Sequence, residues 1–548
     1  MGQAPAPSGE SADRRILFLV RAALVLGAAL AIAVHGFSEI RTLRLREPMG
    51  MWETTYASIS RVWPHEYQLG NYVAGHDNYG PGYPAFCRPF VHLIADVYVA
   101  HRTANLVAIC AACAALFGIL RSNRCSVPIC AAVTAAFYAL NEGTYSVQAR
   151  PDFLVAFEIL LVLGIGQPSF RRKWGPVRLG ILLGMLALAA YLTKPYAVLA
   201  WAIVVGHIAL ERRWRQAAVV AGLGAAILGG GLCLYANANP YYFFESFTGL
   251  RAATDMNGAW FVMQVRDFSV LACGLIMIAV PAGIQFLRRS KQSHADEAPD
   301  AESRAGASGN AGYWGWAVLI GAVALIAGPG WHRGAYLTYF LHLLLPQLSV
   351  FAGMAFAGPT FAARRWPWRE ALLVGNLTVL VALAPRAPAA DPGWDALARD
   401  VLRQPGRVVV DFIMEPIARQ RDGATILGDG LTAFALAEPL LIDPPTSISS
   451  MALAETREYE TALRREVFGP VRPEAIYLDV LFQAQPGSGR PAKTIPRDGL
   501  TYLLSGLEGE YRVASVFTIH PYQLSTNTAR QFTGSWESHI LKLVRKER

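Results

Sequence analysis

Long apolar stretches separated by short polar connections dominate the first 385 residues of the chain. A helix that spans a bilayer needs about 20 mainly apolar residues. The segment 84–100 carries Arg88, His92 and Asp96, so its pattern favours an interfacial or re-entrant helix instead of a span. Eleven other stretches predict membrane-spanning helices, at 16–37, 103–120, 126–142, 152–168, 176–193, 195–211, 216–236, 267–287, 313–330, 335–357 and 370–385.

Arginine and lysine residues gather in every second connection between these stretches. Cytoplasmic loops of membrane proteins are enriched in Lys and Arg, so the pattern predicts a cytoplasmic N-terminus. The opposite face then receives a long first loop, 38–102, and the C-terminal tail. The cation clusters are Arg14/Arg15, Arg121/Arg124, Arg171/Arg172/Lys173, Arg212/Arg213/Arg215, Arg288/Arg289/Lys291 and Arg364/Arg365/Arg369.

Two segments depart from this apolar pattern. Residues 288–312 are polar and small, which predicts a flexible cytoplasmic linker. From residue 386 onward the composition becomes that of a soluble domain, with helices such as 453–467 between short strands. We therefore expect a transmembrane domain at 1–385 and a small α/β domain at 386–548. The predicted strands are Val408–Phe412, Thr425–Leu427, Ala475–Leu481 and Arg512–Phe517.

The composition agrees with a membrane protein. Apolar residues make up 53% of the chain and charged residues only 16%, against about 25% in soluble proteins. The mean hydropathy is +0.30, which excludes a cytosolic globular protein and a disordered scaffold. The excess of 49 Lys and Arg over 40 Asp and Glu is explained by cytoplasmic loops and does not indicate a nucleic-acid partner. Of the seven cysteines, Cys110 and Cys113 lie one helical turn apart inside an apolar stretch, and no Cys/His cluster supplies further ligands, so the sequence indicates no metal centre.

The first loop is rich in aromatic and polar residues, and long loops of this kind are usually functional. A carboxylate at the membrane surface can act as a general base on an acceptor hydroxyl, although most such acids are simply solvated. Pro81 and Pro84, together with Gly80 and Gly82, predict a turn that directs the chain back toward the bilayer. The acids of the loop region are Glu39, Glu47, Glu53, Glu66 and Asp77.

Several cations fall on the same predicted face. Arg150 and Asp152 stand at the start of an apolar stretch, where they could equally serve as a helix cap and interface anchor. Lys194 lies between two apolar stretches, where a cation either snorkels or pairs with an anion such as a phosphate. His332 and Arg333 precede another helix. Cations beside loop carboxylates suit a lipid-phosphate substrate whose leaving group is that phosphate.

These motifs occur in an order that resembles a known family. They are Glu53-x-x-Tyr56, YGPGYPAF at 79–86, His101-Arg102, ARPDFLVAF at 149–157, YLTKPYAVLA at 191–200 and GAYLTYFLHLLLP at 334–346. Over about residues 12–385 the chain resembles GT-C-fold glycosyltransferases. It is similar to the bacterial integral-membrane transferases that use polyprenyl-phosphate sugars, which are related to protein mannosyltransferases and to the lipid A aminoarabinose transferase.

The resemblance implies a polytopic α-helical protein of the bacterial inner membrane whose site faces the periplasm. The expected reaction moves a sugar from a polyprenyl-phosphate donor to an acceptor hydroxyl, with inversion in a single displacement. Family members usually carry an Asp-Glu pair soon after the first helix, whereas position 52 is Trp, so Asp77 or Glu39 is an alternative to Glu53 as the base. The implied roles are base for Glu53 and Asp77, donor-phosphate binding for Lys194, Arg150 and Arg102, and substrate binding for Tyr56, Tyr79, Tyr83 and Asp152; we add His332 and Arg333 to the phosphate-binding residues.

Some members of this family use a divalent cation such as Mg²⁺ or Mn²⁺ and others do not, and the lack of a D-x-D pattern argues against one here. The expected partners are the lipid-linked sugar donor, membrane lipid, and a glycan, lipid or protein acceptor. A lipid or small-molecule transporter or flippase is the main alternative. The chain lacks the internal repeat and the paired broken helices that would favour it. A non-catalytic assembly subunit whose tail binds a partner is a third reading.

Overall fold

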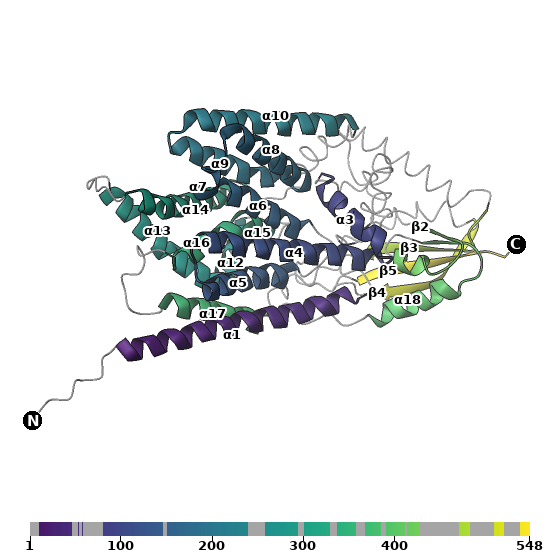
Figure 1. Ribbon diagram of the computed structural model, residues 1–548. Helices are drawn as coiled ribbons and strands as arrows, with labels where there is room; N and C mark the ends of the chain where they lie inside the picture. Colours follow the sequence, from purple (N-terminus) through teal and green to yellow (C-terminus); the bar gives the residue numbers. More distant parts are fainter. Residues whose placement is uncertain are drawn as a thin grey trace, which may run out of the picture.

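The computed structural model is a bundle of helices with a small sheet at one end (Figure 1). It describes residues 10–45, 53, 57, 80–145, 151–238, 258–293, 301–328, 337–357, 368–384, 391–410, 414–426, 471–482, 509–519 and 537–547. The helices of the bundle are α1 (Glu10–Leu43), α3 (Gly82–Leu93), α4 (Val97–Ser122), α5 (Val127–Tyr145), α6 (Asp152–Gly166), α7 (Pro168–Arg171), α8 (Pro176–Thr193), the 3-10 helix η1 (Pro195–Val198), α9 (Leu199–Leu210), α10 (Trp214–Ala238), α12 (Gly258–Leu271), α13 (Cys273–Ser293), α14 (Ala301–Ala327), α15 (Thr338–Leu343), α16 (Leu345–Met354) and α17 (Trp368–Ala382).

Several of these helices have the length and hydropathy of a membrane span. Among the described residues, five single helices qualify: Arg15–Leu43, Val97–Ser122, Pro176–Thr193, Trp214–Asn237 and Gly309–Ala327. The pair Gly258–Leu271 and Cys273–Gln285, bent by 90°, qualifies as a sixth. Helices also occupy the remaining apolar stretches, but without reaching these limits. The chain is a polytopic helical protein, and the count of eleven spans stays a prediction.

The start of α4 shows how local sequence sets a helix boundary. The Asp96 carboxylate accepts hydrogen bonds from the backbone N–H groups of Tyr98 and Val99 at 3.0 and 3.1 Å, which caps the helix. The helix therefore begins at Val97, before the predicted start at 103. The segment 84–100 is divided between α3, which ends at Leu93, and the first turn of α4.

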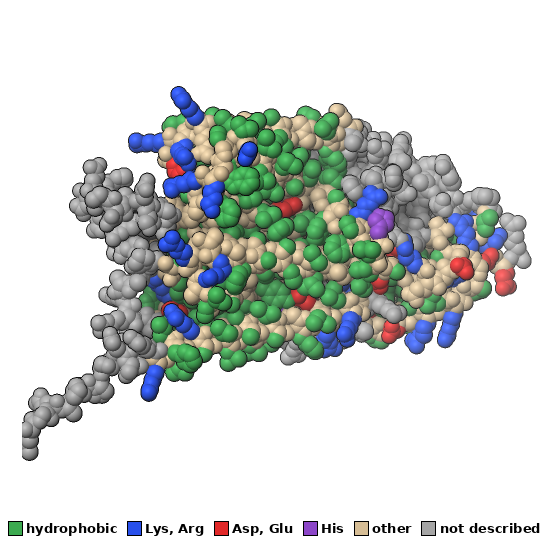
Figure 2. Space-filling view, in the orientation of Figure 1, with side chains coloured by type: hydrophobic (Ala, Val, Ile, Leu, Met, Phe, Trp, Pro, Cys, Tyr) green, Lys and Arg blue, Asp and Glu red, His purple; other side chains and the backbone are tan. Residues whose placement is uncertain are grey.

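Polar contacts join the connections at one end of the bundle. Asn123, after α4, donates to Gln167 at 3.1 Å and accepts from Asn310 of α14 at 2.8 Å. The buried Arg171 forms an ion pair with the partly exposed Glu211, after α9. Three of the predicted cation clusters, 121–124, 171–173 and 212–215, follow the helices that end here. Figure 2 shows hydrophobic side chains over the middle of the bundle and Lys and Arg side chains toward its two ends.

The segment expected to be a flexible linker is helical at both of its ends. Helix α13 continues to Ser293 and α14 begins at Ala301, so the expectation for 288–312 needs correction there. Residues at the start of α14 include several alanines, which favour helix. The central part of the segment lies outside the described residues.

A mixed sheet follows the bundle, after α17 and the helix α18 (Pro392–Arg403). Its strand order is β2-β1-β3-β5-β4; β1 is parallel to β2 and β3, and β5 is antiparallel to β3 and β4. Helix α18 packs Trp394, Leu397 and Val401 against the sheet. Our predicted strands match the first four, whereas β5 was missed. The strands are β1 (Val408–Val410), β2 (Ala424–Ile426), β3 (Ala475–Phe482), β4 (Tyr511–Ile519) and β5 (Glu537–Arg545).

The sheet domain lies at the end of the bundle opposite the start of α1 (Figure 1). The short helix α19 (Glu415–Ala418) of this domain contacts α4. The start of α4, the end of α8 and the start of α6 thus share one end of the bundle with the sheet, which we call the sheet end. The predicted helix at 453–467 lies outside the described residues.

Candidate functional site at the sheet end

A buried ion pair joins two of the sequence motifs at the sheet end. Lys194 directly follows α8 and is 1% exposed, and Asp152 opens α6 and is 2% exposed. The Lys194 ammonium donates to Asp152 Oδ1 at 2.7 Å. A negative charge in the first turn of α6 is also favoured by the helix dipole. Lys194 is therefore paired with an anion of the protein and does not simply snorkel toward water.

Two further side chains complete this pair. The Tyr196 hydroxyl, on η1, lies 2.5 Å from His342 Nδ1, and the two rings stack. His342, on α15, directs Nε2 toward Asp152 Oδ1 at 3.4 Å. We did not predict either residue as part of the site. Tyr196 lies in the YLTKPY motif and His342 in the GAYLTYFLH motif. The motifs therefore included both residues, although neither residue type by itself indicated a site.

The backbone before α15 is held in an unusual conformation. Leu337 has a φ of +53°, a left-handed conformation that is uncommon for a branched side chain. Its N–H donates to Gln264 Oε1 of α12 at 2.7 Å. This contact fixes where α15 begins and hence where His342 lies.

The glycine-rich turn at the end of the first loop packs against the same place. A Cβ on Gly82 would lie 2.4 Å from Thr193 Oγ1 and 2.8 Å from its backbone nitrogen. Only a residue without a side chain allows this approach. Tyr83, the next residue, places its hydroxyl 3.3 Å from His101 Nδ1 on α4. The turn therefore links the Lys194 region to the start of α4.

A buried carboxylate next to Lys194 was not predicted. Glu158, on α6, is 9% exposed, and its Oε1 accepts a hydrogen bond from the Thr193 hydroxyl at 2.9 Å. In the sequence, Glu158 is one acid inside an apolar stretch. Only the folded structure shows that it bonds to Thr193, the residue before Lys194.

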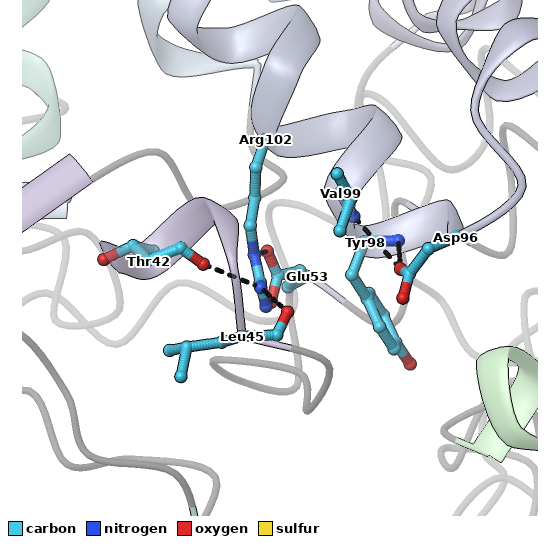
Figure 3. A network of polar contacts seen from close by, with 7 residues as sticks. All are labelled: Thr42, Leu45, Glu53, Asp96, Tyr98, Val99 and Arg102. Atoms are coloured by element: carbon cyan, nitrogen blue, oxygen red, sulfur yellow. Dashed lines mark hydrogen bonds and ion pairs between the residues drawn. The ribbon is translucent and has the colours of Figure 1, made fainter. Parts of the chain in front are cut away.

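The loop acid Glu53 is bound by Arg102 (Figure 3). Arg102 Nε and Nη2 donate to the two oxygens of Glu53 at 2.8 and 2.7 Å, and both side chains are completely buried. Arg102 Nη1 donates to the backbone carbonyls of Thr42 and Leu45, at 3.0 and 2.5 Å. All three guanidinium nitrogens thus tie the first loop to the end of α1. The expected phosphate-binding role of Arg102 would require these contacts to be released.

Burial also affects the neighbouring cap residue. It raises the pKa of the Asp96 carboxyl, despite the N–H groups of Val99 and Tyr98 and the charge of Arg102, which act in the opposite direction. The carboxyl lies beside the Arg102 network in Figure 3. Its ordering of the first turn of α4 holds Arg102 in place.

A second buried polar cluster lies between α1 and α5. His35 Nδ1 is 2.5 Å from Glu142 Oε2, and the Tyr138 hydroxyl donates to Glu39 at 2.5 Å. The sequence placed Glu39 in the first loop, which is wrong, because α1 continues to Leu43 and turns Glu39 toward α5. The apolar stretch ended at residue 37, but these polar partners let the helix continue.

The remaining predicted site residues, Tyr56, Asp77, Tyr79, Arg150, His332 and Arg333, lie outside the described residues. Within the ranges that the structure describes, no group of three His, Cys, Asp or Glu side chains lies close enough together to hold a metal ion. The arrangement that the structure does show is a cation with polar partners at the end of an apolar bundle. A lysine ammonium is an N–H donor to anions, so an anion that reaches Lys194 would share or take over the ammonium that now donates to Asp152.

Comparison with known proteins does not assign the chain to a family. No protein-family model matches the sequence, and no curated protein matches it. Among solved structures, the chain is similar to ArnT from Cupriavidus metallidurans bound to undecaprenyl phosphate, with 14% identity, 94% of this chain and 97% of that chain covered, and a TM-score of 0.43. The apo state of the same protein gives 16% identity, the same coverage and a TM-score of 0.37. These likenesses are low, and neither by itself supports a function for this chain.

Proposed function

We propose that this chain is a GT-C-fold glycosyltransferase that moves a sugar from a polyprenyl-phosphate donor to an acceptor hydroxyl. The dispersed motifs of the chain occur in the order that resembles this class of transferase. The observation that carries it is the meeting of those motifs at the sheet end of the bundle. Lys194, Asp152, the turn at Gly82 and the helix with His342 come from distant parts of the chain and lie together.

The position of Lys194 favours a lipid phosphate as its ligand. A lipid-linked phosphate lies where apolar helices meet the aqueous phase, and Lys194 stands at the end of one such helix, α8. The ammonium would stabilise the negative charge that develops on the leaving phosphate. Arg150, His332 and Arg333 are proposed as further cations around this phosphate, and Tyr56, Tyr79 and Tyr83 as contacts to the substrate.

The first loop is proposed to supply the base. Glu53 is the first candidate, and Arg102 would hold its carboxylate in place; Asp77 is the second. The base removes the proton of the acceptor hydroxyl, whose oxygen bonds to the anomeric carbon. The bond from that carbon to the phosphate oxygen breaks, and the lipid phosphate leaves with the electron pair. The sugar is inverted in this single displacement.

The cation pattern supports a site on the periplasmic face of a bacterial inner membrane, with a cytoplasmic N-terminus and a periplasmic C-terminal domain. Nucleotide sugars are absent there, so a sugar donor would have to be lipid-linked. The α/β domain stands beside the site and is proposed to cover it or to bind the acceptor, which is a glycan, a lipid or a protein.

The test is a melting-temperature measurement on the purified protein in detergent with a panel of polyprenyl-phosphate sugars. We expect one donor to raise the melting temperature of the wild type and of Glu53→Gln, and Lys194→Ala to abolish that rise. Lys173→Ala is the matched control, because Lys173 is exposed at the opposite end of the bundle. A donor-dependent rise that survives in Lys194→Ala, or no rise with any donor, would contradict the proposal and favour a transporter or an assembly subunit.

A further inference from the structure

We infer that His342, oriented by Tyr196, is a positioning residue that holds Asp152 in place when Lys194 binds a lipid phosphate. This inference rests on the proposed function, because it assumes that Lys194 is the phosphate-binding cation. It assigns a role to two side chains that the motifs alone do not distinguish from core residues.

The first step is the orientation of the His342 ring. A carboxylate oxygen of Asp152 faces Nε2 at 3.4 Å, so the ring proton belongs on Nε2. Nδ1 then accepts a hydrogen bond from the Tyr196 hydroxyl at 2.5 Å. The hydrogen bond at one nitrogen thus sets what the other nitrogen presents to its neighbour. Both groups are held firmly, because His342 is completely buried and Tyr196 also packs against Tyr339.

The second step is the sharing of one oxygen. Asp152 Oδ1 accepts from Lys194 Nζ at 2.7 Å, and the same atom faces His342 at 3.4 Å. The longer separation exceeds that of a normal hydrogen bond. Of these two side chains, Lys194 is therefore the closer partner of Asp152, and His342 approaches the same oxygen from another helix.

The third step concerns an incoming phosphate. An anion that approaches Lys194 also approaches the Asp152 carboxylate, and it competes for the same ammonium. A buried carboxylate that loses its partner is strongly destabilised. His342 Nε2 is placed to strengthen its contact with Asp152 as Lys194 turns toward the phosphate, which keeps the carboxylate paired. Among the described residues, Asp152 of α6 and Tyr196 of η1 contact the His342 ring, and the Lys194 ammonium lies over the Tyr196 ring.

The test measures the affinity of the purified full-length protein in detergent for undecaprenyl phosphate, with undecaprenol as the phosphate-free control. His342→Phe keeps an aromatic ring and removes the donor, whereas His342→Gln keeps an N–H donor of similar reach. We expect His342→Phe to weaken undecaprenyl phosphate binding by about tenfold and His342→Gln to stay within about threefold of the wild type. Tyr196→Phe removes only the hydroxyl and is expected to weaken binding by severalfold, with undecaprenol binding unchanged in every variant.

Equal loss of affinity in His342→Gln and His342→Phe, or no loss in His342→Phe, would overturn the inference. If His342→Phe does not fold, Tyr196→Phe decides: unchanged affinity for the phosphate overturns the role of the pair. Lys194→Ala separates this inference from the proposed function. Unchanged binding in Lys194→Ala would reject the proposed function itself, whereas loss in Lys194→Ala with wild-type binding in His342→Phe would reject only the positioning role.

Discussion

The buried pair of Arg102 and Glu53 predicts a large and specific loss of stability when its cation is removed. Arg102→Met keeps the length and most of the volume of the side chain but leaves the Glu53 carboxylate buried without its partner. Breaking a buried ion pair from one side costs about 3–5 kcal/mol. The carbonyls of Thr42 and Leu45 lose a donor as well. We therefore expect Arg102→Met to lower the free energy of unfolding by about 4 kcal/mol or more.

Glu53→Gln should cost less, about 1–3 kcal/mol, because an amide still offers Arg102 an acceptor. The double variant Glu53→Gln/Arg102→Met should lose less stability than the sum of the two single variants, since no buried charge is left unpaired. Arg178→Met is the matched control, because Arg178 is exposed on α8, and it should stay within about 0.5 kcal/mol of the wild type.

The assay is equilibrium unfolding in mixed detergent micelles with a rising fraction of SDS, followed by tryptophan fluorescence. Equal shifts of the unfolding midpoint in Arg102→Met and Arg178→Met would refute the reasoning. Additive effects in the double variant would show that the two side chains do not act as a pair.

Three further predictions concern other parts of the molecule. Gly82→Ala should lower the melting temperature and weaken donor binding in the melting-temperature assay, because its Cβ would press on Thr193; an unchanged protein would argue against the close contact. Glu142→Gln should destabilise the protein by about 1–3 kcal/mol in the SDS assay through its lost charge-assisted contact with His35, and a value near zero would remove this cluster as a tie between α1 and α5. Trp394→Ala should destabilise the sheet domain by about 3–5 kcal/mol. Limited proteolysis should then cut after residue 391 while the bundle stays intact, and equal resistance to protease in both proteins would contradict this.

The sequence pattern predicted most of the described helices and strands because the signals for both are local. Long apolar stretches indicated the helices, and short segments rich in strand-forming residues indicated four of the five strands that the structure describes. The missed strand β5, Glu537–Arg545, begins with three polar residues and does not alternate polar and apolar residues regularly. It pairs with β3 and β4, which precede it in the chain. Glu39 was misplaced because a helix can continue past its apolar stretch where Tyr138 supplies a partner.

The contacts among the candidate site residues depend less on local pattern. Lys194 stood out as a cation in an apolar environment, and the sequence left open whether it snorkels or pairs with an anion; the structure pairs it with Asp152. Its partner Asp152 was named, but as a substrate contact. His342 and Glu158 could not be identified, because their roles depend on Tyr196 and Thr193, which only folding brings beside them. The bond between Glu53 and Arg102 likewise joins residues on separate segments whose proximity no local pattern encodes.

The central claim is most directly tested by the release of free polyprenyl phosphate from a polyprenyl-phosphate sugar. The purified protein would be incubated with the donor identified by the melting-temperature assay and with an extract of the bacterial cell envelope as the source of acceptor. We predict that the wild type and Lys173→Ala release the lipid phosphate and transfer the sugar to an acceptor, whereas Lys194→Ala and Glu53→Gln do not. Equal release by all four proteins, or an intact donor that the wild type merely moves across a vesicle membrane, would contradict the account.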